Sequence, residues 1–185
     1  MNVSLTSHSS RTNNSWLFAP SSLILANHYL PLNGALAVKG SSVEKILFSL
    51  NVEDNWPPFG AEGVWCEKVG ENFKLKNAPF FIPKLAANDV FSAELDSVNQ
   101  QVYDFTVIEE SGHSVIWVMN NKNIEISLFE KELISLGCSI EGIKKCSLFS
   151  IDVPVSLDIC ALNKLVDTFE SKGLDFAFPV WRHGK

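Results

Sequence analysis

Residues 114–180 decide the fold: SVIWVMNNKNIEISLFEKELISLGCSIEGIKKCSLFSIDVPVSLDICALNKLVDTFESKGLDFAFPV. The stretch opens with a continuous apolar strand, Ser114–Met119. Apolar side chains then recur at helical spacing over Ile126–Leu136 and again over Ile159–Phe169, and each pattern stops at a glycine, Gly137 or Gly173. Two strand-like segments lie between the helices and one follows them. The order βαββαβ predicts a ferredoxin-like sandwich, with two helices over one face of a four-stranded antiparallel sheet.

The strands of this sandwich are short and have clear turn signals. The middle pair is expected at Ser139–Ile143 and Ser147–Val153, around a lysine turn, and the last strand at Phe176–Trp181. Ser156 and Asp158 are the candidate N-caps of the second helix.

The preceding residues, 43–110, have a β pattern without a helical period. Polar and apolar residues alternate on both sides of a hairpin turn at Gly70, and the two prolines after Trp56 indicate a rigid turn. We expect five short strands, the last one running over Gln101–Ile108, in a small curved sheet or partial barrel. The predicted fold class is therefore α+β: a β-rich subdomain at 43–110, followed by a ferredoxin-like subdomain at 111–185.

Charge is unevenly spread along the 185 residues, whose formal net charge is −6. Residues 1–42 contain two basic residues and no acid, so residues 43–185 have a net charge of −8. An acidic domain repels phosphate backbones and attracts basic partners. The predicted strands of the sandwich also lack the basic residues that accompany RNA-binding aromatic side chains. We therefore expect a basic protein partner and no nucleic acid.

Residues 1–42 are rich in Ser and Asn, and Pro20 and Pro31 interrupt their apolar patches. This is a poor match to a secretory signal. We expect a mobile leader or a translation start placed too far upstream, and a cytoplasmic protein. No apolar stretch approaches the roughly 20 residues of a membrane-spanning helix, so we expect no membrane association.

Seven short motifs occur in order between Val43 and Trp181. They begin at Trp56 (WPP), Glu62 (EGVW), Asn77 (NAPFF), Asn88 (NDV), Glu110 (ESGHS), Leu136 (LGC) and Asp152 (DVP). Together these motifs resemble a bacterial family of small uncharacterised proteins. That family is a domain of unknown function with P-P, L-W, N-x-P-F-F and S-G-H-S-type signatures, so the resemblance implies a shared fold more than an activity.

Candidate functional residues come mainly from these motifs. His113 could act as a base, and a triad with Ser114 and Asp89 is formally possible. Adjacent strand residues point to opposite faces, however, and no G-x-S-x-G elbow is present, so a structural turn is the preferred interpretation. We expect Glu62 and Asp89 to be ordinary surface carboxylates, and the basic end after Trp181 to be solvated.

The four cysteines form no CxxC pair and have no zinc-finger spacing, so neither a metal site nor a cofactor is predicted. The preferred hypothesis is a non-catalytic binding protein, such as an immunity-type inhibitor whose acidic surface blocks a basic partner. A small-molecule sensor, an enzyme centred on His113 and a homodimer remain alternatives. The residues expected to bind the ligand or partner are Trp56, Glu62, Trp65, Asn77, Asp89, His113 and Ser114.

Overall fold

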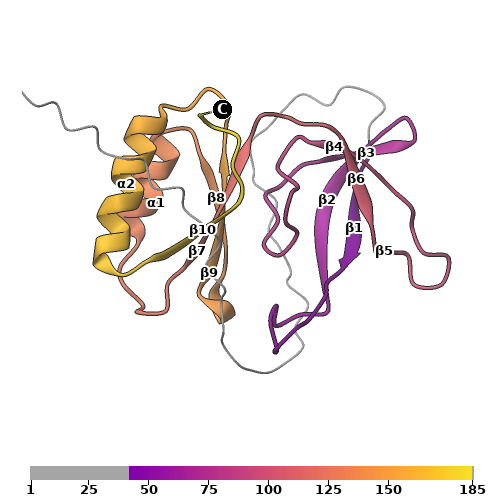
Figure 1. The fold of residues 1–185 in the computed structure, drawn as a ribbon, viewed down its shortest axis with the longest axis horizontal. Helices are drawn as coiled ribbons and strands as arrows, with labels where there is room; N and C mark the ends of the chain where they lie inside the picture. The colour runs from indigo at the N-terminus through magenta and orange to yellow at the C-terminus, as the bar shows by residue number, and fades with distance from the viewer. Residues whose placement is uncertain (1–41, 185) are drawn as a thin grey trace, which may run out of the picture.

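The computed structural model describes residues 42–184, so residues 1–41 of the expected leader lie outside the described part. Two sheets lie side by side, with both helices beyond the second sheet (Figure 1). The first sheet belongs to residues 43–109, called here the β-rich half. The second sheet and the helices belong to residues 114–180, called here the sandwich half.

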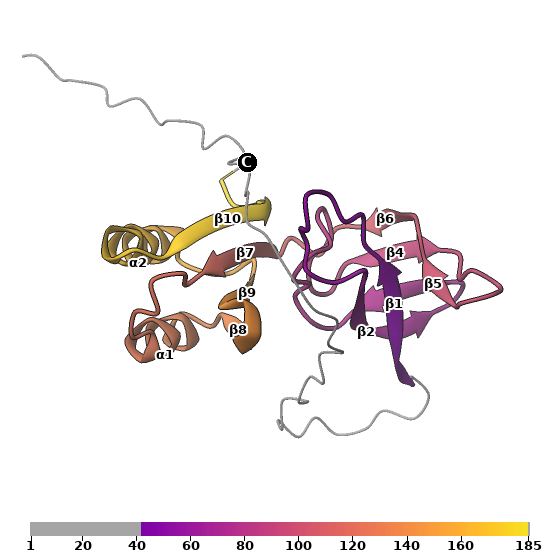
Figure 2. The ribbon, with the colours of Figure 1, turned by 90° about the horizontal axis from the view of Figure 1, so that it is seen from below.

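The sandwich half has the predicted βαββαβ order. Its four strands form an antiparallel sheet in the order β10-β7-β9-β8, and the helices cover one face of it (Figure 2). This arrangement confirms the α+β fold class. The elements are β7 (Ser114–Met119), α1 (Ser127–Ser135), β8 (Ser139–Ile143), the short 3₁₀ helix η1 (Lys144–Cys146), β9 (Leu148–Val153), α2 (Ile159–Lys172) and β10 (Asp175–Val180).

The ends of the helices follow local chemistry. The Asp158 carboxylate caps α2 by accepting a 2.9 Å hydrogen bond from the backbone N–H of Cys160. Gly137 and Gly173 have φ angles of +89° and +110°, a region in which glycine is the least strained residue, and each ends a helix. Between these signals, the periodic apolar side chains of both helices are buried against the sheet.

The β-rich half is a curled sheet of six strands in the order β5-β1-β2-β3-β4-β6. The prediction of one continuous strand over Gln101–Ile108 is wrong, because the structure has two strands there, separated by Tyr103 and Asp104. Its first part pairs in parallel with β1, and its second part pairs with β4. The strands are β1 (Val43–Ser49), β2 (Ala61–Val69), β3 (Asn72–Leu75), β4 (Val90–Ala93), β5 (Gln101–Val102) and β6 (Phe105–Glu109).

Aromatic rings fill the concave side of this curled sheet. The Phe48 ring lies 5.6 Å from Phe91 and 5.6 Å from Phe105 between ring centroids, so β1 shares one core with β4 and β6, although β2 and β3 lie between them in the sheet order. Contacts of this kind add to the stabilisation from apolar burial.

Residues 78–82, called here the bridging segment, connect the two halves. The Pro79 carbonyl accepts hydrogen bonds from Trp117 Nε1 at 2.7 Å and from Ser150 Oγ at 2.8 Å, both on the sandwich sheet. Phe80 and Phe81 lie in one apolar cluster with side chains from β7 and β9. The sheet of the sandwich half is therefore covered by helices on one face and by the bridging segment on the other.

The two described α-helices contain 9 and 14 residues. Neither is long and apolar enough to cross a membrane.

Candidate functional site

Asp89 and Arg182 form a buried ion pair between the two halves. Arg182 Nη1 and Nη2 donate to the two Asp89 carboxylate oxygens at 2.7 and 2.8 Å, and the exposed fractions of these side chains are 7% and 0%. The backbone N–H groups of Ala86 and Ser111 donate to the same carboxylate, each at 2.8 Å. Burial acts to raise the pKa of Asp89, but Arg182 and these donors outweigh it and lower the pKa.

This pair corrects two expectations. Asp89 is not a surface carboxylate, because it has no exposed surface. The basic end after Trp181 is not simply solvated, because the guanidinium of Arg182 is buried at the junction between the halves. Arg182 is not among the residues predicted from the sequence, because 93 residues separate it from its partner.

His113 pairs with Asp152 on β9. The distance between His113 Nδ1 and Asp152 Oδ1 is 2.8 Å, and both side chains keep some exposed surface, at 17% and 16%. Burial raises the pKa of Asp152, and His113 opposes that rise. The imidazole is therefore oriented by Asp152, whereas Asp89 is fully used by its own partners.

Ser114 bonds to a different histidine, His183. Ser114 Oγ lies 2.7 Å from His183 Nδ1 and accepts a 2.8 Å hydrogen bond from the backbone N–H of Arg182. His183 Nε2 lies 3.0 Å from the Pro154 carbonyl, which can only accept, so Nε2 carries a proton, and in the neutral imidazole Nδ1 accepts from the hydroxyl. A hydroxyl beside a neutral imidazole is the start of a nucleophile–base pair. Ser114 has no exposed surface, however, so a substrate could not reach it without rearrangement.

The formally possible triad is therefore not assembled. Its three members, Ser114, His113 and Asp89, bond to three different side chains. Within residues 42–184, no group of three or more His, Cys, Asp or Glu side chains could hold a metal ion.

Glu62 is buried at the bridging segment and is not the surface carboxylate that we expected. Its exposed fraction is 7%, and its two oxygens accept the backbone N–H groups of Phe80 and Phe81 at 2.7 and 2.8 Å. Burial raises the pKa of Glu62 to about 7, and the charge of Glu141 on β8 contributes to that rise. Glu62 thus holds the bridging segment in place.

The remaining candidate residues make structural contacts. Asn77 Oδ1 accepts the backbone N–H of Trp65 at 2.8 Å, and the indole N–H of Trp65 has no hydrogen-bond partner in the described part of the chain. Trp56 is half-buried, with its ring centroid 5.6 Å from that of Phe81. The cavity of about 30 Å³ beside Trp56 is far below the 300–1,000 Å³ typical of ligand pockets.

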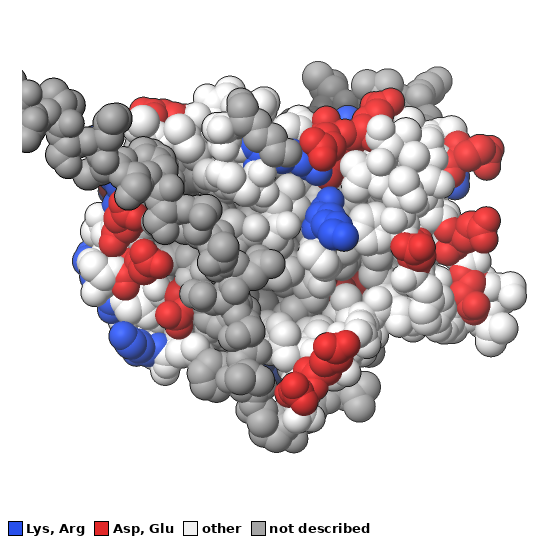
Figure 3. All heavy atoms as spheres, viewed as in Figure 1, with Lys and Arg blue, Asp and Glu red and all other residues white. Residues whose placement is uncertain are grey.

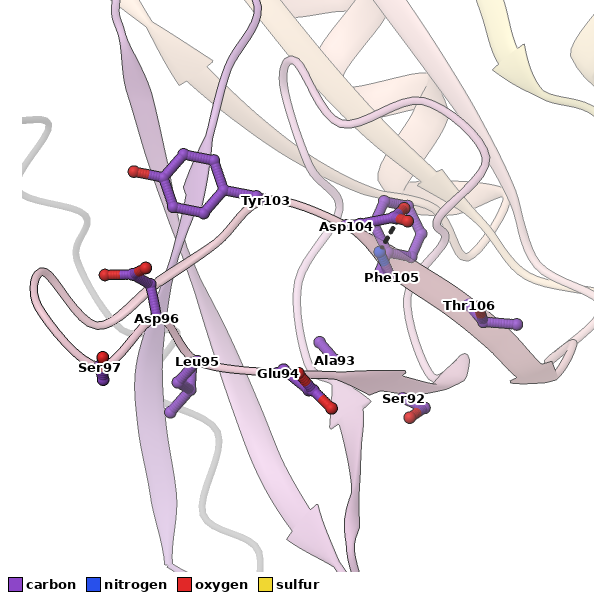
Figure 4. Close-up of a pocket in the computed structure, with 10 residues that line it drawn as sticks. All are labelled: Ser92, Ala93, Glu94, Leu95, Asp96, Ser97, Tyr103, Asp104, Phe105 and Thr106. Atoms are coloured by element: carbon purple, nitrogen blue, oxygen red, sulfur yellow. Dashed lines mark hydrogen bonds between the residues drawn. The ribbon is translucent and has the colours of Figure 1, made fainter.

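A hollow much larger than the cavity beside Trp56, with a volume of about 650 Å³, lies in a different part of the molecule. It lies where the chain leaves β4 and returns to β6, and its lining includes Glu94, Asp96 and Asp104, called here the acidic rim (Figure 4). In the view of Figure 3, carboxylates gather over the side of the β-rich half that is remote from the helices. None of the residues that line this hollow was predicted from the sequence as a site residue.

The signal that could have found it is the absence of Lys and Arg from residues 85–121. This run contains six carboxylates, and Asp89 is the only one of them that is fully buried. The net charge of the domain, on which our expectation rested, does not show where its acidic residues lie.

The fold and the contacts described above define a two-part α+β protein whose candidate residues make structural contacts within its halves and, at Asp89, between them. The chain belongs to the family described as Domain of unknown function (DUF4265), which matches residues 62–175 and therefore spans both halves. A comparison with curated proteins finds no match.

One solved structure has a similar fold. It is described as the "Novel crystal structure of a hypothetical protein from Neisseria gonorrhoeae", with a TM-score of 0.55 and 16% sequence identity. The alignment covers 78% of this chain and 97% of that one. At this identity the likeness shows the fold alone.

Proposed function

We propose that this chain is a non-catalytic binding protein of the bacterial cytoplasm that holds a basic protein partner, as an immunity-type inhibitor would. The observation that carries the proposal is the run of residues 85–121, which has six carboxylates and no Lys or Arg. Four of these carboxylates, on Glu94, Asp104, Glu109 and Glu110, are exposed. Such a surface attracts a basic protein and accelerates its association.

The internal contacts support binding rather than catalysis. Ser114 is enclosed, and Asp89 is occupied by a guanidinium and two backbone donors. A nucleophile must reach the substrate that it attacks, and an enclosed hydroxyl offers no such access. The acidic surface, in contrast, is open to a partner.

The test is capture of a partner from native lysate, followed by binding kinetics in a salt series. We expect a partner with a basic surface whose association rate falls markedly as ionic strength rises, because exposed charges are screened beyond about 8 Å at physiological salt. An association rate that is indifferent to salt, or a partner without a basic surface, would contradict the proposal.

Two triple variants sharpen this test because they change the net charge equally. In the first, Glu94→Gln, Asp104→Asn and Glu109→Gln neutralise part of the acidic run. In the control, Glu132→Gln, Glu170→Gln and Asp175→Asn neutralise exposed carboxylates of the sandwich half. Only the first variant should slow association at low salt. Equal slowing in both would show that net charge alone, and not this surface, attracts the partner.

A further inference from the structure

Apolar side chains are exposed around the hollow between β4 and β6, which is unusual for so acidic a surface. The exposed fractions are 38% for Leu95, 91% for Val98 and 63% for Tyr103. Leu95 and Tyr103 line the hollow itself. Exposed apolar side chains that are rimmed by polar groups mark interaction surfaces in soluble proteins.

The hollow exists because the hairpin opens and then closes again. Pairing of β4 with β6 ends at Ala93 and Phe105. The two backbones meet once more where the Asp96 N–H donates to the Gln101 carbonyl at 3.0 Å. In Figure 4, Glu94 and Leu95 lie on one side of the gap, and Tyr103 and Asp104 lie on the other. This opening gives the hollow its volume of about 650 Å³, within the range of ligand-binding pockets.

Among residues 42–184, no Lys, Arg or His forms an ion pair with the carboxylates of the acidic rim. The side chain of Glu94 has no hydrogen bond or ion pair with any described residue. Asp96 Oδ1 accepts the backbone N–H groups of Val98 and Asn99, which lower the pKa of Asp96 and keep it ionised. Asp104 Oδ1 accepts the N–H of Phe105 at 2.9 Å, and no residue in the described part of the chain donates a hydrogen bond to its other oxygen.

The charge and the shape together identify the complementary group. Three carboxylates next to an aromatic ring fit a cation with several donors, and Arg has five N–H donors on a flat group that stacks on aromatic faces. Tyr103 provides such a ring, and its hydroxyl is held by Asn99 Nδ2 at 2.7 Å. We propose that the hollow between β4 and β6 receives an arginine side chain from an extended segment of a protein partner, while Leu95 and Tyr103 contact the apolar part of that segment.

This inference rests on the proposed function and names the surface that would perform it. The test uses a defined probe, an end-capped peptide that alternates Arg and Val, and its isosteric counterpart in which citrulline replaces Arg. Backbone amide resonances of the isotope-labelled full chain are followed during titration at low ionic strength. The Arg peptide should shift the amides of Glu94, Leu95, Tyr103 and Asp104, and the citrulline peptide should not.

Two double variants supply the control. Glu94→Gln with Asp104→Asn should weaken binding of the Arg peptide about tenfold, a change of about 1.4 kcal/mol in binding free energy. Glu132→Gln with Glu170→Gln, on the helices, should leave binding unchanged, although it changes the net charge equally. Amide spectra show in each case whether the variant is folded.

Three results would overturn the inference: shifts that map elsewhere, equal weakening by both variants, or no binding of the Arg peptide. These results differ from failure of the proposed function. If a captured basic partner binds in a salt-dependent way while Glu94→Gln with Asp104→Asn changes nothing, the function stands and this surface is wrong. If neither a basic partner nor the Arg peptide binds, both are wrong.

Discussion

Replacing Asp89 by Asn should destabilise the protein more than any exposed substitution, because it breaks a buried ion pair between the two halves. The carboxylate receives four hydrogen bonds, two from Arg182 and one each from the backbone N–H groups of Ala86 and Ser111. An Asn side chain has one oxygen and adds two donors, which face the donors of the guanidinium. The positive charge of Arg182 then stays buried without its partner.

The magnitude follows from this geometry. Removing one partner of a buried ion pair costs about 3–5 kcal/mol. Full loss of four charge-assisted bonds, at roughly 1.5–3 kcal/mol each, would cost more. Arg182 Nε, however, already lies 3.5 Å from a carboxylate oxygen of Glu110, and Nη1 lies 3.3 Å from the His113 carbonyl, so part of the interaction survives. We therefore expect Asp89→Asn to lower the free energy of unfolding by about 3–5 kcal/mol.

The assay is urea unfolding at pH 7, followed by circular dichroism and tryptophan fluorescence. Asp175→Asn, an exposed change of the same chemistry, should alter the free energy of unfolding by less than about 0.5 kcal/mol. If Asp89→Asn does not fold, Arg182→Lys provides a second measurement, because it keeps the charge but loses the bidentate geometry. A loss below about 1 kcal/mol in Asp89→Asn would refute the reasoning.

Three further substitutions test the other contacts. Burial raises the pKa of Glu62 to about 7, above its ordinary 4.5, so the folded state holds an extra proton between these values and stability falls as the pH rises through about 7. This difference corresponds to about 3 kcal/mol. Urea unfolding at pH 5 and pH 8 should show that decline in the wild type but not in Glu62→Gln. An equal decline in the free energy of unfolding of both proteins would contradict this expectation. Ser114→Ala leaves a buried amide and an imidazole without their partner, so thermal unfolding should reveal a loss of about 1–3 kcal/mol, whereas an unchanged midpoint would contradict the hydrogen bonds. His113→Ala should cost about 1 kcal/mol, because its partner Asp152 is partly solvated, and should leave partner binding intact. Loss of a measurable hydrolytic activity in that variant would favour an enzyme instead.

The sandwich half could be predicted from the sequence because its signals are local. Helical spacing, the Asp158 cap and the glycines Gly137 and Gly173 each act within one or two turns of a helix. The β-rich half was predicted less completely. The break in the strand at Tyr103 and Asp104 depends on pairing with β1, more than 50 residues earlier, and no local pattern reports such pairing.

The candidate site was predicted least well, for the same physical reason. The sequence contains His113, Ser114 and Asp89, but their partners Asp152, His183 and Arg182 lie 39, 69 and 93 residues away. Residue type alone indicated that the carboxylates lie at the surface, whereas tertiary contacts bury Glu62 and Asp89. The roles of Trp56 and the other candidate residues in partner binding stay predictions.

Asp89 and Arg182 are 93 residues apart in the sequence, and this has a consequence for how the protein is made. Synthesis proceeds from the N-terminus, so all six strands of the β-rich half exist before residue 182 is added. Until then, the carboxylate at the junction between the halves has no guanidinium to neutralise it. Completion of the ion pair is therefore a late event in biosynthesis, and a nascent chain that stalls before Arg182 would expose this junction to proteases and chaperones.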